Sequence, residues 1–102
     1  MDRADILAEA AKLTTGDRNA AYGHPYDNLT HMADMVSAYI NGKYGCFVGL
    51  NAEDMAWIMV TAKMSRSVAT HKDDNYIDAA AYAAIAGECR EIIEGADRSL
   101  DS

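Results

Sequence analysis

The stretch DNYIDAAAYAAIAG, residues 74–87, decides the fold class of this 102-residue chain. It reads as a strong helix because alanine has the highest helix propensity of all residues. After Asp74, its only charged residue is Asp78. A carboxylate that loses water in an apolar helix needs a cation, several hydrogen-bond donors or a metal as its partner. We therefore expect functional chemistry at Asp78, Asp74 one turn before it and Tyr82 one turn after it.

The rest of the chain also indicates helices. Asp2 and Asn51 are suited to cap two of them, and Pro25 to begin another. We expect the helix that starts at Pro25 to end at residues 41–42, an Asn-Gly pair, and the last helix to end at Gly95. The segments with apolar residues at helical spacing, besides the last helix at 74–94, are 4–13, 25–40 and 52–69.

The helix expected at residues 52–69 is apolar on two sides. Met55 and Met59 lie on one side, and Trp57 and Met64 lie on the other. A helix with two apolar sides is expected to be buried between neighbouring elements.

Composition and length indicate one small globular domain. Half of the residues are apolar, which excludes a disordered chain. We expect an all-α domain over residues 1–97, a four- to five-helix bundle, followed by a frayed tail at 98–102. Because a monomer of this size buries a modest share of its surface, we also expect a core shared between subunits, in a homodimer or homotetramer.

The charge balance limits the partners. There are 9 Lys and Arg residues against 16 Asp and Glu residues, for a net charge of -7. Bulk nucleic-acid binding requires a basic face and is not expected. No stretch approaches the ~18 apolar residues that a membrane span requires, and the N-terminus does not resemble a signal peptide. Cys46 and Cys89 follow no metal or redox spacing, so a cytoplasmic protein with reduced thiols is expected.

Asp74 and Asp78 are candidate metal ligands. Two carboxylates four residues apart on a helix can share a divalent cation, and Mg²⁺ often takes only one or two protein carboxylates plus phosphate oxygens. Lys63 and Arg66 are candidates to bind those phosphates. The structural alternatives are an ion pair of Asp78 with Lys63 or Arg66, and a helix-capping role for Asp74.

Glu53 and Asp54 begin the helix at residues 52–69, where acidic residues are favoured for structural reasons alone. Because each precedes an apolar residue by one turn, one of the two acids must border the core. A role in a metal or catalytic site is therefore the second interpretation. If this helix packs antiparallel to the last one, the two acids lie far from Asp74. Only another helix or another subunit could then unite them with it.

A polar loop precedes Pro25. Its segments GDRN, residues 16–19, and YGHP, residues 22–25, combine hydrogen-bond donors, aromatic rings and glycines that could cradle a base or a sugar. It lacks the glycine spacing and the Lys-Ser/Thr pair of a Walker loop, and an ordinary turn is the alternative. The candidate ligand-binding residues here are Asp17, Arg18, Tyr22, His24 and Asn28.

These strings in combination resemble a family of small phage and prophage proteins, over nearly the whole chain. The matching positions are GDR at 16–18, YGHP at 22–25, Asn28, SAYI at 37–40, Leu50, AED at 52–54, Met59, Lys63, Arg66, Asp74, Asp78 and Tyr82. If the chain is encoded by a phage, the host cytoplasm is the expected location.

The order of an acidic helix start, Lys-x-x-Arg and two carboxylates one turn apart is more distantly similar to MazG-like all-α nucleoside triphosphate pyrophosphohydrolases. That resemblance implies an oligomeric bundle in which acidic residues on two facing helices bind Mg²⁺, and in which nucleotides are cleaved to monophosphate and pyrophosphate. It implies catalytic roles for Glu53, Asp54 and Asp78, and metal binding by these three and Asp74.

Two departures from the MazG-like pattern stand out. The first acidic pair is normally Glu-x-x-Glu, and this interpretation takes the chain to have no such pair. The second is normally Glu-x-x-Asp, whereas Asp74 and Asp78 are four residues apart. Losing ligands weakens metal binding and the activation of water.

Three functional interpretations follow. The first is a Mg²⁺-dependent nucleotide pyrophosphohydrolase-like enzyme. The second is a protein that sequesters a nucleotide without hydrolysing it, with Lys63, Arg66 and Tyr82 among its ligand contacts. The third is a structural helical module whose carboxylates only pair with Lys63 and Arg66.

Overall fold

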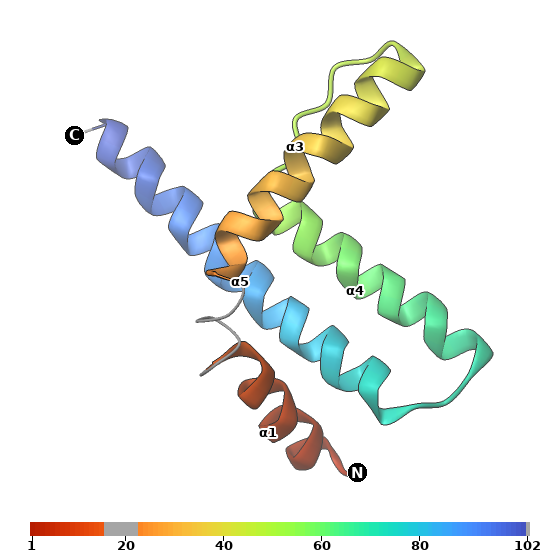
Figure 1. Ribbon diagram of the computed structural model, residues 1–102. Helices are drawn as coiled ribbons and strands as arrows, with labels where there is room; N and C mark the ends of the chain where they lie inside the picture. The colour runs from red at the N-terminus through yellow and green to blue at the C-terminus, as the bar shows by residue number, and fades with distance from the viewer. Residues whose placement is uncertain (16–22, 102) are drawn as a thin grey trace.

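The computed structural model describes residues 1–15 and 23–101, and within these residues every regular element is a helix and there is no strand. This confirms the expected all-α class. The described helices, labelled in Figure 1, are α1 (Arg3–Thr14), α3 (Pro25–Tyr44), α4 (Ala52–Ala69) and α5 (Asp73–Asp101).

Helix α5 is the centre of the arrangement. The helices α4 and α5 form an antiparallel hairpin across a turn at residues 70–72, and α1 lies along the N-terminal half of α5 (Figure 1). Helix α3 packs on α4, and its first turn lies beside the middle of α5. The antiparallel packing of α4 on α5 places the start of α4 far from the start of α5.

The two helix starts predicted from their N-caps are confirmed. The Asp5 N–H donates to the Asp2 carboxylate at 2.9 Å, and the Asp5 carboxylate accepts from the Asp2 N–H. Asn51 and Asp54 form the same reciprocal capping box at the start of α4, with both distances 2.9 Å. Each box satisfies two backbone N–H groups that otherwise lack a partner at a helix start.

The two helix ends predicted from glycines are wrong. Helix α3 runs past Gly42 and ends at Gly45, whose φ of 63° is left-handed and whose N–H donates to the Asn41 carbonyl at 3.0 Å. Helix α5 runs through Gly95. A glycine ends a helix when its backbone turns left-handed, and neither Gly42 nor Gly95 does so.

The core consists of small side chains between closely packed helices. One cluster joins α3, α4 and α5, and a smaller one joins α1 to α5. The alanines of the opening stretch take part in both, because Ala81 lies in the second cluster and Ala86 in the first. The buried residues of the two clusters are Leu29, Ala33, Ala52, Met55, Ala56, Ala86 and Cys89, and Ala10, Ile77 and Ala81.

The expectation that α4 is buried on both sides is wrong for a single chain. Met55 lies in the core, but Trp57 is 49% exposed and Met64 is 59% exposed. The reason is that α3 and α5 cover only part of the surface of α4. Of the helices described here, none is both long and apolar enough to cross a membrane.

Candidate functional site

Residues of the helices α1, α3, α4 and α5 line a partly open cavity of about 450 Å³, called the central cavity below. Its polar wall contains four of the residues that the sequence singled out: Asn28, Lys63, Asp78 and Tyr82. Its apolar wall includes Leu13, Leu29, Met32 and Ile85. Cavities of this size with a few convergent polar groups are typical small-molecule sites.

The ion pair between Lys63 and Asp78 forms part of the cavity wall. The Lys63 Nζ lies 3.2 Å from the Asp78 Oδ2, and the two side chains are 14% and 32% exposed. The antiparallel hairpin explains this contact, because it places the C-terminal half of α4 beside the N-terminal half of α5. Partial burial strengthens the attraction between the two charges. This ion pair is the structural alternative that the sequence analysis gave for Asp78. Both side chains also line the central cavity, where they can contact a ligand.

A second, shallower and more open cavity, of about 440 Å³, lies at the turn between α4 and α5. Arg66, Lys72 and Asp74 contribute its charged groups, and Asp78 lines it as well as the central cavity. Asp74 and Arg66 therefore lie close to Asp78, as the sequence predicted. The cation that pairs with Asp78 is Lys63, and not Arg66.

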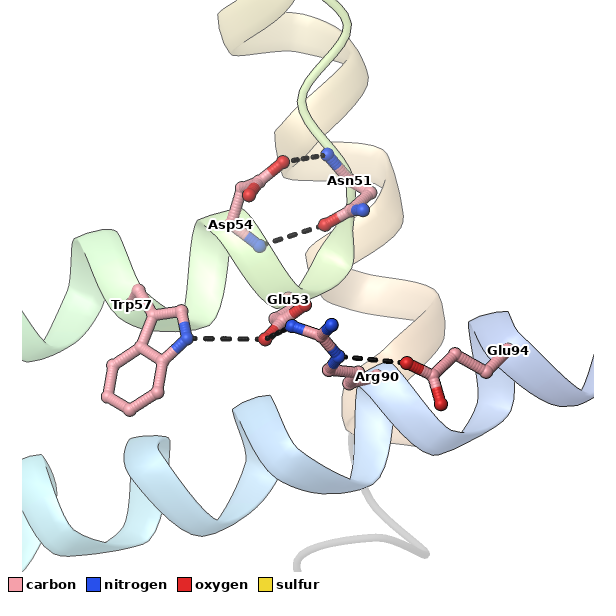
Figure 2. A network of polar contacts seen from close by, with 6 residues as sticks. All are labelled: Asn51, Glu53, Asp54, Trp57, Arg90 and Glu94. Carbon is pink, nitrogen blue, oxygen red and sulfur yellow. Dashed lines mark hydrogen bonds and ion pairs between the residues drawn. The ribbon is translucent and has the colours of Figure 1, made fainter.

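Glu53 and Asp54 lie elsewhere, in the network of Figure 2. The Asp54 carboxylate is used in the capping box of α4. The Glu53 Oε2 accepts from the Trp57 indole Nε1 at 3.4 Å and lies 3.7 Å from the Arg90 Nη1. Arg90 also donates to Glu94 at 2.9 Å, and this hydrogen bond together with the charge of Glu53 raises the pKa of Arg90.

The network around Glu53 is separate from the cavity. Arg90 and Asp78 are twelve residues apart on α5, which corresponds to about 18 Å along the helix axis. A single chain therefore does not unite Glu53 and Asp54 with Asp74 and Asp78.

The expectation that the chain has no Glu-x-x-Glu pair is wrong, because this spacing occurs twice on α5, at Glu88, Glu91 and Glu94. Two of these carboxylates already have partners. Glu88 lies 3.0 Å from the His24 Nε2, and Glu94 accepts from Arg90. The spacing and the Arg90–Glu94 pair, four residues apart on one helix, are visible in the sequence. The contact of Glu88 with His24 depends on the packing of α3 against α5.

Within the described residues, the acidic side chains are not gathered into one cluster of metal ligands. Residues 1–15 and 23–101 contain no group of three or more His, Cys, Asp or Glu side chains placed to hold a metal ion. Asp74 and Asp78 share the second cavity, but Lys63 already neutralises Asp78. The magnesium ion expected from the resemblance remains a prediction.

The polar loop is only partly described. Asp17, Arg18 and Tyr22 lie outside the described residues. His24 caps α3, because its Nδ1 accepts from the Tyr26 N–H at 3.1 Å while its Nε2 contacts Glu88. Its neighbours Gly23 and Pro25, and not His24 itself, line the central cavity.

The two cysteines are free thiols. Cys46 is exposed, and Cys89 is 1% exposed in the core. Burial, followed by the nearby charges of Glu88 and Glu53, raises the pKa of the Cys89 thiol. Cys89 therefore stays protonated at neutral pH and acts as a core residue.

The sequence analysis missed the apolar half of the cavity. Leu29 and Ile85 have the ordinary helical spacing of core residues, and both also pack in the main core cluster. No signal in the sequence distinguishes a core leucine that borders a cavity from one that does not.

The fold and the site define an all-α chain whose central cavity has an apolar wall and a few polar groups. The chain belongs to the family described as "Domain of unknown function (DUF6378)", whose model matches residues 5–90. It is 32% identical over 99 residues to the "Gene 55 protein" of Mycobacterium phage D29. The expected membership of a phage protein family is thereby confirmed.

The match to the phage protein covers 95% of this chain and 62% of the relative. The chain thus spans less than two thirds of the length of the curated relative it matches. No solved structure matches the chain. The finer resemblance to MazG-like enzymes remains an expectation.

Proposed function

We propose that this protein binds a small nucleotide-type ligand in the central cavity. The observation that carries the proposal is that Lys63, Asp78 and Tyr82 converge, from two different helices, on one cavity that also has an apolar wall. A nucleotide offers matching chemistry, since it combines a flat base, a hydroxylated sugar and an anionic phosphate.

Each part of such a ligand has a suitable partner. The half-buried Tyr82 ring and the side chains of Leu29 and Met32 offer an apolar and aromatic surface for a base. The Lys63 ammonium is a suitable partner for a phosphate. Asp78 can accept hydrogen bonds from sugar hydroxyls or from base N–H groups.

Binding without hydrolysis is the form of the proposal that the geometry favours. The carboxylates that a metal-dependent hydrolase would need are divided between the start of α4 and the start of α5. Asp78, the acid in the cavity, already pairs with Lys63. We therefore propose sequestration of a nucleotide, with Mg²⁺-dependent hydrolysis as the alternative that the experiment below distinguishes.

The relative from a phage supports a role during infection. A phage protein that holds a host nucleotide, such as a signalling nucleotide, would act in the cytoplasm of the host cell. The homodimer or homotetramer expected from the chain length also belongs to this proposal. The exposed Trp57 and Met64 side chains on α4 are compatible with a subunit contact.

The proposal is tested by a thermal-shift screen. Common nucleotides, cyclic dinucleotides and ADP-ribose-type molecules are added with and without Mg²⁺, and the incubated ligand is then analysed by mass spectrometry. We expect at least one nucleotide to raise the Tm and to be recovered intact. At a ligand concentration of 100 times the Kd, the stabilisation is about 2.7 kcal/mol.

The variant Asp78→Asn supplies the site-specific arm of this screen. We expect it to lose most of the ligand-induced shift, because it removes the carboxylate of the cavity wall. Asp34→Asn, at an exposed position on α3, is the matched control and is expected to keep the shift. A new phosphate product would support the hydrolase instead, and no shift with any nucleotide, with or without Mg²⁺, would support the structural module.

A further inference from the structure

The side of α4 that α3 and α5 leave uncovered is exposed and almost uncharged. Between residues 57 and 69, Arg66 is the only charged residue among the exposed ones, in a chain of which a quarter is charged. The solvent side of a surface helix normally carries its charged residues, so this side has the composition of a buried one. The exposed residues are Trp57, Ile58, Thr61, Ala62, Met64, Ser65, Arg66, Val68 and Ala69.

The spacing on this side is that of a helix that packs against another helix. Trp57, Thr61, Met64 and Val68 follow one another at intervals of four, three and four residues, which is the spacing of the contact positions in paired helices. We call these four residues the α4 stripe. Trp57 is 49% exposed, Met64 59% and Val68 88%. The stripe is about 16 Å long, and in a single chain it has no helix packed on it.

We propose that the α4 stripe packs against the α4 stripe of a second copy of this chain, with the two helices antiparallel. The inference deepens the oligomeric part of the proposed function, because it assigns the contact surface and the direction of the two chains. It also explains why the sequence of α4 is apolar on two sides: one side packs within the chain, and the other packs on the second copy.

The charge of the chain supports a second copy as the partner at this surface. Two chains with a net charge of -7 repel each other, so they associate best through a surface that brings no acidic groups together. In a twofold dimer the same patch of both chains meets at the interface. The α4 stripe satisfies this condition, because none of its four residues is charged.

The ends of α4 determine the direction. The first turn of α4 is acidic, with Glu53 and Asp54, and the last turn is basic, with Arg66. Antiparallel packing places each acidic first turn beside the basic last turn of the partner, and parallel packing places like charges together. Arg66 forms no ion pair with another residue in the described part of the chain, so its guanidinium is available for this contact.

The contact surface is tested by sedimentation equilibrium over a range of protein concentrations, without any ligand. We expect a dimer of 11.1 kDa chains. Met64→Glu is expected to raise the dimer Kd about 100-fold or more, because it buries an unpaired carboxylate on both sides of the interface. Met35→Glu is the matched control, since Met35 is 65% exposed on α3. It is expected to change the Kd by no more than about twofold.

Two further readouts accompany the mass. Circular dichroism checks that both variants keep their helices. Trp57 is the only tryptophan, so its fluorescence reports on the interface directly. We expect the Trp57 emission to shift to longer wavelength on dilution of the unaltered protein, and to lie at the longer wavelength at all concentrations in Met64→Glu.

The direction is tested by cysteine cross-linking in a Cys46→Ser background, which removes the exposed native thiol. Thr61 lies midway between residues 53 and 69, so antiparallel packing brings the two copies of position 61 together. The two copies of position 68 then lie about 21 Å apart along the axis, too far for a disulfide. We expect Thr61→Cys to form a disulfide-linked dimer and Val68→Cys to remain unlinked. Linking of both variants would mean parallel packing, and linking of neither would contradict the α4 interface.

The remaining outcomes separate this inference from nucleotide binding. A chain that is monomeric at all concentrations would contradict the inference, as would a dimer that Met64→Glu leaves intact. A dimer that only Met35→Glu dissociates would move the interface to α3. Because no ligand is used, these failures leave the proposed nucleotide site standing, and a failure of nucleotide binding leaves the dimer standing.

Discussion

Replacing Lys63 with methionine is expected to reduce nucleotide affinity about 100-fold, as measured by calorimetry. Two losses combine in this variant, each worth about tenfold. The ligand loses its ammonium partner at the cavity wall, and the Asp78 carboxylate, which lies 3.2 Å from Lys63 Nζ in the intact protein, is left to repel the phosphate. Methionine keeps most of the apolar stem, so the packing of α4 on α5 is retained.

The same variant is expected to lower the free energy of unfolding by about 2 kcal/mol, measured by urea denaturation. Breaking a fully buried ion pair costs about 3–5 kcal/mol, and the 32% exposure of Asp78 reduces that cost through solvent screening. Removing both charges, in Lys63→Met with Asp78→Asn, is expected to restore most of the stability, because no unpaired charge remains.

The double variant separates a binding site from a structural ion pair. A site predicts that the double variant folds stably and still binds nucleotide poorly, while Lys63→Arg, which keeps the charge, retains most of the affinity. If the pair is only structural, Lys63→Met, Lys63→Arg and the double variant are all expected to bind nucleotide as the unaltered protein does. Unchanged binding by Lys63→Met would contradict the proposed site.

Replacing Leu29 with alanine is expected to lower the free energy of unfolding by about 3 kcal/mol. Leu29 is 4% exposed, in the cluster where α3 packs on α4 and α5. Truncation removes buried apolar contacts and leaves a void that this small-residue core cannot easily fill. Urea denaturation followed by circular dichroism measures the change.

Met35→Ala is the control on the same helix. Met35 is 65% exposed, and its truncation is expected to change the stability by less than about 0.5 kcal/mol. Equal effects of the two truncations would mean that α3 does not pack on the α4–α5 hairpin through Leu29.

The local signals in the sequence predicted the helix starts well. Asp2 and Asn51 act through hydrogen bonds to residues three positions away, so sequence alone contains both partners. The helix ends were harder, because Gly42 and Gly95 stay helical while Gly45 turns left-handed. A glycine permits the left-handed turn without requiring it, and the rest of the chain determines which one makes it.

The candidate site was predictable only in part, because contacts within one helix follow from the sequence spacing and contacts between helices do not. The periodicity of α5 placed Asp74, Asp78 and Tyr82 on one face. That Asp78 pairs with Lys63, and not with Arg66, depends on how α4 lies against α5. The separation of Glu53 from Asp78 depends on the same antiparallel packing. From the sequence alone, this packing was one of the possible arrangements and could not be predicted.

The choice between the two acidic regions can be read directly from a ¹⁵N NMR titration with the nucleotide that gives the largest thermal shift. Trp57 is the only tryptophan, so its indole N–H is a unique signal beside Glu53 and Arg90. The backbone amides of Lys63, Asp78 and Tyr82 report on the central cavity. We expect these three amides to shift while the Trp57 indole stays in place. A shifted Trp57 indole with unchanged cavity amides would contradict the account and move the ligand site to the Glu53 network.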